Sequence, residues 1–141
     1  MNIRVGGIIV ESNRVLTMKY QYGNTDVYTI PGGNLEFGEA LEEALIREYE
    51  EELCILTEVK EEAFTCETLR DSEKTLHQLY WLKIREGKPE INRAETSALA
   101  ICWLELDKLD TYNLYPSVGT YIKESSNLKG KYLGDVQQKW F

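Results

Sequence analysis

The chain has 141 residues, of which 43% are hydrophobic and 28% are charged, and its formal net charge is −8. These values are those of a globular protein, so they exclude disorder over the whole chain and fit a single domain spanning residues 1–141. The negative charge argues against nucleic acid as a partner, because binding to its backbone uses clustered Lys and Arg side chains. The sequence has no signal peptide and no run of about 18 apolar residues, so we expect a cytoplasmic protein with no membrane partner.

The first part of the chain is expected to alternate strands and turns before one helix. β-Branched residues and turn signals predict, in chain order, a strand over residues 3–10, a turn at Ser12-Asn13, the hairpin partner of that strand over 15–20, a loop over 21–26 and a short strand over 27–30. Pro31-Gly32-Gly33 then breaks the strand. A helix is predicted from Glu39 to Leu53, with Gly38 as its N-cap.

The second part of the chain is richer in strands. The same signals predict one long or bulged strand over 55–69, a polar turn over 70–74, a strand over 76–84, a polar loop over 86–96, a strand over 98–106 and a second helix over 117–124. The tail from residue 125 has no clear pattern. Several strands with one central and one late helix favour an α/β or α+β sandwich, in which helices flank a mixed central β-sheet.

Charged side chains gather on one face of the first predicted helix. On a helix that advances about 100° per residue, one arc holds a guanidinium and carboxylates, from Arg47, Glu48, Glu51 and Glu52. Two small residues, Ala40 and Ala44, fall in the same arc and are expected to leave room for a loop or a ligand. The opposite arc is predicted to be the core face, formed by Leu41, Leu45, Ile46, Tyr49 and Leu53.

This acidic arc is costly without a counter-ion. Like charges three or four residues apart repel, and the macrodipole disfavours each anion at the C-terminal end of a helix by roughly 0.3–1 kcal/mol. A hard divalent cation such as Mg²⁺ prefers carboxylate oxygens and would relieve both effects. The alternative, from the residues alone, is an ordinary solvated acidic surface.

The loop before the helix completes a longer pattern. Gly33, Glu39 and the charged arc match the spacing G-x5-E-x7-R-E-x-x-E-E. This is the box of the Nudix hydrolases, and the chain resembles that MutT-like family in the motif and in its order of strands and helices. It departs from the family pattern at Cys54, where the family has a glycine that suits the helix exit, and at Tyr28 and Tyr49.

The resemblance implies a hydrolase that cleaves a phosphate anhydride bond in a nucleoside diphosphate linked to another group. Water would attack phosphorus, and Mg²⁺ or Mn²⁺ would be bound by Glu48, Glu51, Glu52 and the backbone carbonyl of Gly32. Arg47 would orient the carboxylates through charge-assisted hydrogen bonds. Many relatives are dimers, so a homodimer is expected.

The general base and the substrate contacts stay open at this stage. Glu48 is one candidate for the base, and a carboxylate of the 86–96 loop, Glu95 or Glu90, is the other. His77 is expected to be a packed histidine. The residues expected to contact a small nucleotide-like substrate are Gly32, Gly33, Tyr20, Tyr22 and Tyr28. For Trp140-Phe141 two alternatives stay open, which are covering a pocket or a partner subunit and fraying of the terminus.

Two other functions fit the same resemblance. One is a non-catalytic domain that senses a nucleotide, and the other is an isomerase of isoprenoid diphosphates, for which Cys66 lies in no recognisable motif. The complete set of box carboxylates favours hydrolysis over both. The downstream proline and tyrosine that accompany ADP-ribose and dinucleoside polyphosphate hydrolysis are absent, which weakens those substrates; Arg70, Asp71 and Ser72 stand there.

Overall fold

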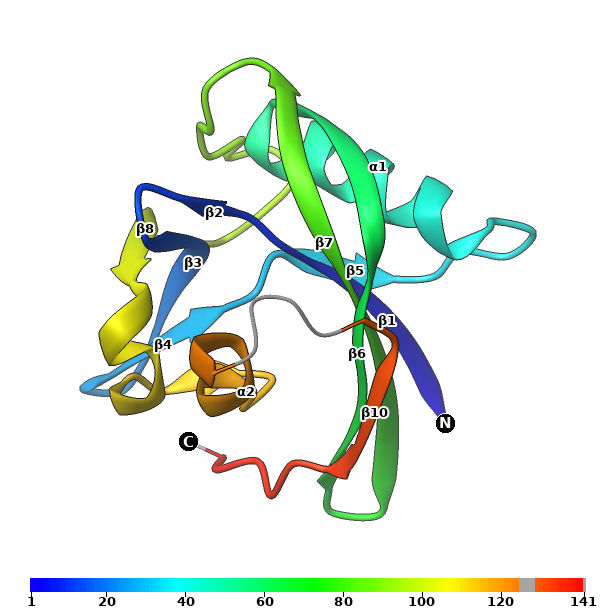
Figure 1. The fold of residues 1–141 in the computed structure, drawn as a ribbon, viewed down its shortest axis with the longest axis vertical. Helices are drawn as coiled ribbons and strands as arrows, with labels where there is room; N and C mark the ends of the chain where they lie inside the picture. The colour runs from blue at the N-terminus through cyan, green and yellow to red at the C-terminus, as the bar shows by residue number, and fades with distance from the viewer. Residues whose placement is uncertain (125–128, 141) are drawn as a thin grey trace.

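The computed structural model describes residues 1–124 and 129–140, and it is a mixed α+β structure (Figure 1). Its elements are, in chain order, β1 (Asn2–Ile8), β2 (Val10–Glu11), β3 (Arg14–Tyr22), β4 (Thr25–Thr29), β5 (Gly32–Asn34), α1 (Leu41–Leu53), β6 (Leu56–Arg70), β7 (Glu73–Glu86), β8 (Ala100–Glu105), a 3₁₀ helix (Leu106–Thr111), β9 (Leu114–Tyr115), α2 (Gly119–Glu124) and β10 (Lys131–Asp135). Residues 125–128 of the unassigned tail, and Phe141, lie outside the described residues.

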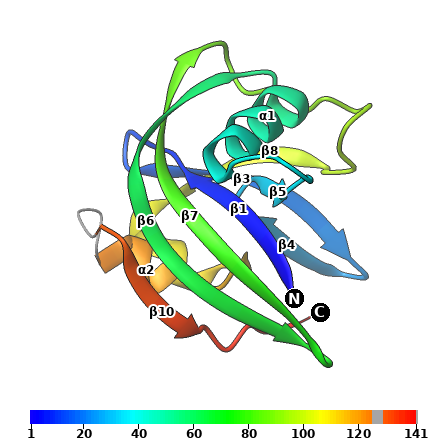
Figure 2. The same cartoon turned by 90° about the vertical axis from the view of Figure 1, so that its right-hand side faces the viewer.

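The strands form two mixed sheets. The first has the order β10-β6-β7-β1-β5, and the second has the order β2-β3-β4-β9 with β8 paired to β3. Figure 2 shows β6 and β7 as a long curved hairpin that runs past α1 at one end of the molecule. The parallel pairing of β1 with β7 and the antiparallel pairing of β1 with β5 make the first sheet mixed, as the sequence predicts.

Two hydrophobic clusters cover the two faces of the first sheet. Side chains of α1, among them Leu45, Tyr49 and Leu53, pack with Val5 of β1 on one face. Side chains of α2, such as Ile122, pack in the cluster on the other face. The curved first sheet therefore separates the two helices, as Figure 1 shows. The predicted core face of the first helix is confirmed at these three positions.

The predicted pairing at the N-terminus is wrong. Residues 3–10 were expected to form one strand paired with 15–20, but Asn2–Ile8 runs along β7 and β5 in the first sheet, and only Val10–Glu11 pairs with β3. The alternation of side chains predicts a strand but does not specify its partner, and residues from Val5 to Ile9 are buried on both faces. Strand β10, parallel to β6, was not predicted either, because its polar residues carry no strand pattern.

The start of α1 also differs from the prediction. The helix begins at Leu41 with Ala40 as its N-cap, so Gly38 and Glu39 lie before it. The Glu43 carboxylate accepts the Ala40 N–H at 3.0 Å and thereby caps the first turn. Ala44 is fully buried in the core and does not leave room for a ligand, which corrects its predicted role.

Cys54 ends α1 in a left-handed conformation, with φ 57° and ψ 32°. Its N–H donates to the Glu50 carbonyl at 3.2 Å, so the helix closes in the way a glycine normally allows. The Cβ of Cys54 makes this conformation unfavourable, because the side chain crowds the backbone. The departure from the family glycine is therefore accommodated by strain, and not by a different helix exit.

No helix within residues 1–124 and 129–140 is long and apolar enough to cross a membrane.

Replacing Cys54 with glycine should stabilise the protein, because glycine adopts the left-handed conformation without strain. We expect Cys54→Gly to raise the free energy of unfolding by about 0.5–1 kcal/mol in urea denaturation. Cys54→Ala is the matched control, since it removes the thiol but keeps the Cβ. An equal gain in both variants would mean that loss of the thiol, and not relief of the backbone, stabilises the protein.

Candidate functional site

The Gly32-Gly33 pair lies where two elements approach closely. Strand β5 pairs with β1, and a Cβ on Gly32 would overlap the Val5 carbonyl oxygen. A Cβ on Gly33 would overlap the carboxylate of Glu48. Only glycine fits at either position without a shift of its neighbours. The bare backbone of this pair therefore places the Glu48 side chain directly against the loop.

Tyr49 of α1 also holds the loop in place through hydrogen bonds. Its buried hydroxyl donates to the Gly7 carbonyl at 2.6 Å and lies 2.9 Å from the Pro31 carbonyl. Gly7 belongs to β1, and Pro31 begins the loop, so one side chain of α1 connects the helix, the strand and the loop. The tyrosine that departs from the family pattern thus sets the position of the loop above the helix.

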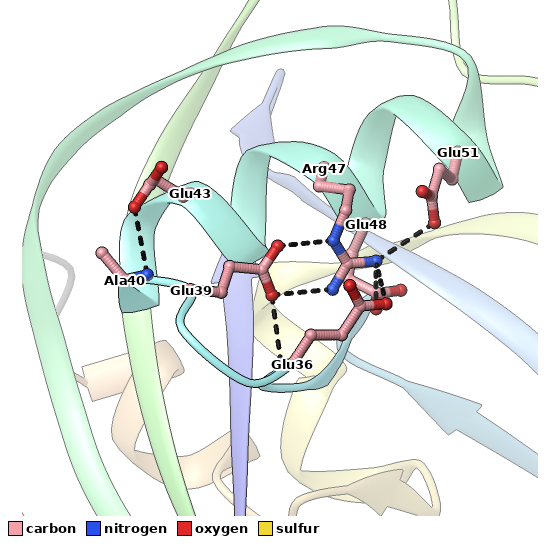
Figure 3. Close-up of polar contacts among 7 residues, drawn as sticks. All are labelled: Glu36, Glu39, Ala40, Glu43, Arg47, Glu48 and Glu51. Carbon is pink, nitrogen blue, oxygen red and sulfur yellow. Dashed lines mark hydrogen bonds and ion pairs between the residues drawn. The ribbon is translucent and has the colours of Figure 1, made fainter.

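Arg47 is the centre of a network of carboxylates (Figure 3). Its Nε and Nη2 donate to the two oxygens of Glu39 at 2.6 and 3.0 Å, a bidentate ion pair. Its Nη1 donates to Glu48 and to Glu51, at 3.1 Å each. The fourth carboxylate, Glu36, lies 3.6 Å from Nη1. The guanidinium therefore gathers side chains from the loop and from one face of α1, as predicted from the helical arc.

The carboxylates on this face shift one another's pKa values. Burial, together with the nearby charge of Glu48, raises the pKa of Glu52 to about 7. Burial is also the main reason why the pKa of Glu48 is raised, although Arg47 opposes the shift. Among the described residues, Glu52 makes no ion pair with its side chain. The site thus holds a partly buried carboxylate that lacks a cationic partner, which is a common property of functional sites.

The loop between β7 and β8 is docked on the C-terminal end of α1. Asn92 donates from its backbone N–H to the Glu52 carbonyl at 2.9 Å and from its side-chain amide to the Glu51 carbonyl at 2.8 Å. These bonds satisfy carbonyls that a helix end leaves unpaired. The docking brings Glu95 close enough to raise the pKa of Glu52. Glu90 contributes only a backbone N–H, to the Leu53 carbonyl at 3.0 Å.

An aromatic cleft of about 270 Å³ is lined by residues of β3, β4, β6, β9 and the C-terminal segment. Its lining includes Tyr22, Tyr115 and Trp140. Tyr20 is closer to the carboxylates: its hydroxyl lies 3.1 Å from the Thr96 hydroxyl, and Glu52 contributes to the raised pKa of its phenol, whose main cause is burial.

Tyr28 does not line the cleft, so its predicted contact with substrate is not supported. Side chains alternate along a strand, and Tyr28 points away from Val27 and Thr29, which do line the cleft. It packs instead against Tyr112, with ring centroids 5.4 Å apart. His77 is fully buried, and its Nε2 lies 2.9 Å from the Thr68 hydroxyl, so the prediction of a packed histidine is confirmed.

A model of the NUDIX domain matches residues 2–124, most of the chain. The chain belongs to the NUDIX family. Its fold is similar to that of a NUDIX hydrolase from Nitrosomonas europaea, with a TM-score of 0.75 and 15% identity over 92% of this chain and 91% of that chain. A MutT protein from Methanosarcina mazei gives a TM-score of 0.74 and 19% identity over 91% and 96% of the two chains. These likenesses establish the Nudix fold.

A curated relative matches a shorter stretch. The protein named ADP-ribose pyrophosphatase in Methanocaldococcus jannaschii is 37% identical over 59 residues, which cover 41% of this chain and 35% of that protein. The alignment therefore spans about a third of the relative's length.

Nudix hydrolases generally use divalent metals, and the donor set of this member is of the right kind. Carboxylates from Glu48, Glu51 and Glu52 are the ligands that Mg²⁺ prefers. Within the described part of the chain, no three acidic, His or Cys side chains are arranged as a metal-binding cluster. The reason is visible in the network, because Glu48 and Glu51 are both turned toward Nη1 of Arg47. A cation would have to draw these oxygens away from the guanidinium.

Two parts of this Nudix site were not found from the sequence. Asn92 lies in a polar loop, where an asparagine that bonds a distant helix end has no local signature. Arg4 lies on β1. Its charge partly opposes the rise that burial causes in the pKa values of Glu48 and Glu52. A lone arginine in a predicted strand could have drawn attention, but its position beside the loop depends on the pairing of β1 with β5.

Adding a methyl group at Gly33 should displace Glu48. We expect Gly33→Ala to lower the free energy of unfolding by up to about 1 kcal/mol, because the new Cβ displaces the flexible Glu48 carboxylate from its ion pair with Arg47. The double variant Gly33→Ala/Glu48→Ala should recover most of that loss, as measured by urea denaturation of all members of the cycle. Simple additivity of the two substitutions would contradict this close contact.

Proposed function

We propose that the protein hydrolyses a phosphate anhydride bond in a nucleoside diphosphate linked to another group, with Mg²⁺ or Mn²⁺ as cofactor. The observation that carries the proposal is the gathering of Glu48, Glu51 and Glu52 on one face of α1, beside the Gly32-Gly33 loop. Membership of the NUDIX family supports a hydrolase, and the relative named ADP-ribose pyrophosphatase supports an anhydride as the bond that is cleaved.

Each side chain of the network has a role that follows from its contacts. Glu48, Glu51 and Glu52, with the Gly32 carbonyl, would hold the cation. When bound, the cation would neutralise phosphate charge and lower the pKa of a coordinated water. Arg47 would keep the carboxylates oriented, since it bonds Glu48 and Glu51 directly.

Glu39 would act indirectly in this scheme. Its carboxylate is only 14% exposed and holds the Arg47 guanidinium through two bonds, so it supports the side chain that orients the ligands. Glu39 is thus a positioning residue and not a ligand.

Glu95 is the general base that the geometry favours. It stands on the loop docked at the C-terminal end of α1, three residues after Asn92, and its charge contributes to the raised pKa of Glu52. Its side chain is exposed and makes no ion pair within the described residues. Glu48, the other candidate, is occupied by Arg47 and pressed against Gly33, which leaves less freedom for proton transfer.

A hydrolysis screen tests the proposal and narrows the substrate. Phosphate or nucleotide release with millimolar Mg²⁺ should be measured over nucleoside triphosphates, nucleotide sugars, ADP-ribose and dinucleoside polyphosphates. Turnover of at least one anhydride supports the hydrolase. Tight binding of a nucleotide without any turnover would instead indicate a nucleotide sensor.

Removing a proposed ligand should abolish most of the turnover while the fold survives. We expect Glu51→Gln and Glu52→Gln each to lower kcat/KM by at least about 10²-fold, because a lost metal ligand removes stabilisation of the charge that develops on phosphate. Glu50→Gln is the matched control, since Glu50 is a neighbouring exposed glutamate on the same helix outside the network. Full activity of both ligand variants would refute the assignment.

Mg²⁺ should also stabilise the folded protein. The carboxylates lie close together only in the native state, so a cation that binds there raises the melting temperature, and the stabilisation grows with the logarithm of one plus its free concentration divided by Kd. The shift should appear with millimolar MgCl₂ and be absent with NaCl of equal ionic strength. It should shrink in Glu52→Gln but persist in Glu50→Gln. Equal melting temperatures with and without Mg²⁺ would count against a metal site here.

A further inference from the structure

Arg4 is a partly buried cation that makes no ion pair with any carboxylate of the described residues. It lies on β1, and its Nη2 donates to the Ile30 carbonyl at 2.8 Å. Its guanidinium carbon lies 5.4 Å from the centroid of the Tyr115 ring. The other terminal nitrogen, Nη1, is buried and has no hydrogen-bond partner among residues 1–124 and 129–140. A buried donor on a charged group lowers the stability of the folded protein when it has no acceptor. An acceptor atom of a ligand at this position would remove that cost.

A second polar atom beside Arg4 is unpaired in the same way. Arg4 and His77 are register partners in the β1–β7 pair, so their side chains share one face of the sheet. His77 is fully buried, and its Nδ1 has no partner in the described part of the chain. Its ring packs edge-on against Tyr115, with centroids 5.3 Å apart. Two neighbouring buried polar atoms without partners at one aromatic ring indicate a place for a polar ligand group.

This place adjoins the aromatic cleft. Tyr115 lines the cleft together with Tyr22 and Trp140, and its ring also contacts the Arg4 guanidinium. Val5, the next residue of β1, is the register partner of Gly33, which lies against the Glu48 carboxylate. A molecule with its flat ring in the cleft and its reacting bond near α1 would pass Arg4.

The other cations of this region are already engaged. Each nitrogen of Arg47 donates to a carboxylate, which leaves it little capacity for a phosphate. Lys19 pairs with Asp26 at 3.5 Å. Arg70 lines the cleft and lies over the Trp140 ring at 5.2 Å, but its side chain is exposed, so water can satisfy its donors. Among the described residues, Arg4 is the arginine next to the cleft that has a buried terminal nitrogen without a partner.

We propose that Arg4 binds the phosphate group nearest the nucleoside of the substrate, while the base occupies the cleft formed by Tyr22, Tyr115 and Trp140. The proposal rests on the hydrolase function proposed for this site and deepens it, because it assigns the phosphate contact that Arg47 cannot make. A phosphate is favoured over a base carbonyl because a buried guanidinium without a carboxylate lacks an anion, and phosphate supplies both the charge and the acceptor oxygens.

Metal-free binding measurements test this assignment apart from catalysis. The dissociation constants of AMP, GMP, adenosine and guanosine should be measured by calorimetry for the wild-type protein, Arg4→Gln and Arg4→Lys. Arg4→Gln should weaken AMP and GMP binding by about 10- to 100-fold and leave the nucleosides within about 2-fold, because only the phosphate contact is lost. Arg4→Lys should recover part of the affinity, since it keeps the charge without the planar fork.

The control variant is Arg14→Gln, which removes an exposed arginine at the start of β3, away from the cleft. It should leave all four dissociation constants unchanged. Melting curves of each variant identify the temperature range in which the binding data describe folded protein, and Arg4→Lys gives the decisive comparison if Arg4→Gln is unstable.

The outcomes separate this inference from the proposed hydrolysis. If Arg4→Gln weakens the binding of nucleosides and nucleotides equally, Arg4 does not act through the phosphate, and the proposal is overturned. The same holds if the wild-type protein binds AMP no more tightly than adenosine. A phosphate-specific loss in a protein that hydrolyses no anhydride would support Arg4 as the phosphate contact and reject the hydrolase.

Discussion

The ion-pair network of Arg47 is the interaction on which the candidate site depends. Carboxylates at adjacent positions of one helix face repel each other, and the C-terminal end of a helix disfavours them further. A guanidinium that bonds Glu39 in a bidentate manner and also bonds Glu48 and Glu51 offsets this repulsion with short charge-assisted hydrogen bonds. The guanidinium therefore holds the acidic face together, and a cation bound there would compete with Nη1 for oxygens of Glu48 and Glu51.

The absence of side chains at Gly32 and Gly33 is as important for the site as the charged side chains of α1. Gly32 and Gly33 allow β5 to approach β1 and α1 so closely that a methyl group at either position would overlap a neighbour. Tyr49 then bonds backbone carbonyls of both the strand and the loop. These contacts determine the height of the loop over the helix, and hence the position of the Glu48 carboxylate. The strained helix exit at Cys54 shows that the chain tolerates local cost close to this region.

In the proposed function, positive charge must lie where the phosphates of the substrate bind, although the protein is acidic. This requirement would be divided between separate groups. Arg47 is committed to its own carboxylates, a divalent cation would neutralise the reacting phosphate, and Arg4 on the other side of the loop retains an unused donor. The physical reason is that the Arg47 guanidinium already donates to carboxylates from each nitrogen, so it has little donor capacity left for a substrate phosphate.

The sequence by itself determined the helical part of the site. The 3.6-residue period brings Arg47, Glu48, Glu51 and Glu52 to one face of any helix that contains them. The close backbone approach that Gly32-Gly33 allows also follows from the residue type alone. Only the tertiary structure decided the remaining partners. Alternation along a strand does not reveal which strand lies beside it. The pairing of β1 with β7, the packing of Tyr28 against Tyr112 and the position of Arg4 beside His77 and Tyr115 therefore could not be predicted from a local pattern. Asn92 belongs with these, because it bonds a helix end about 40 residues away, and contacts over such distances arise only when the whole sheet has formed.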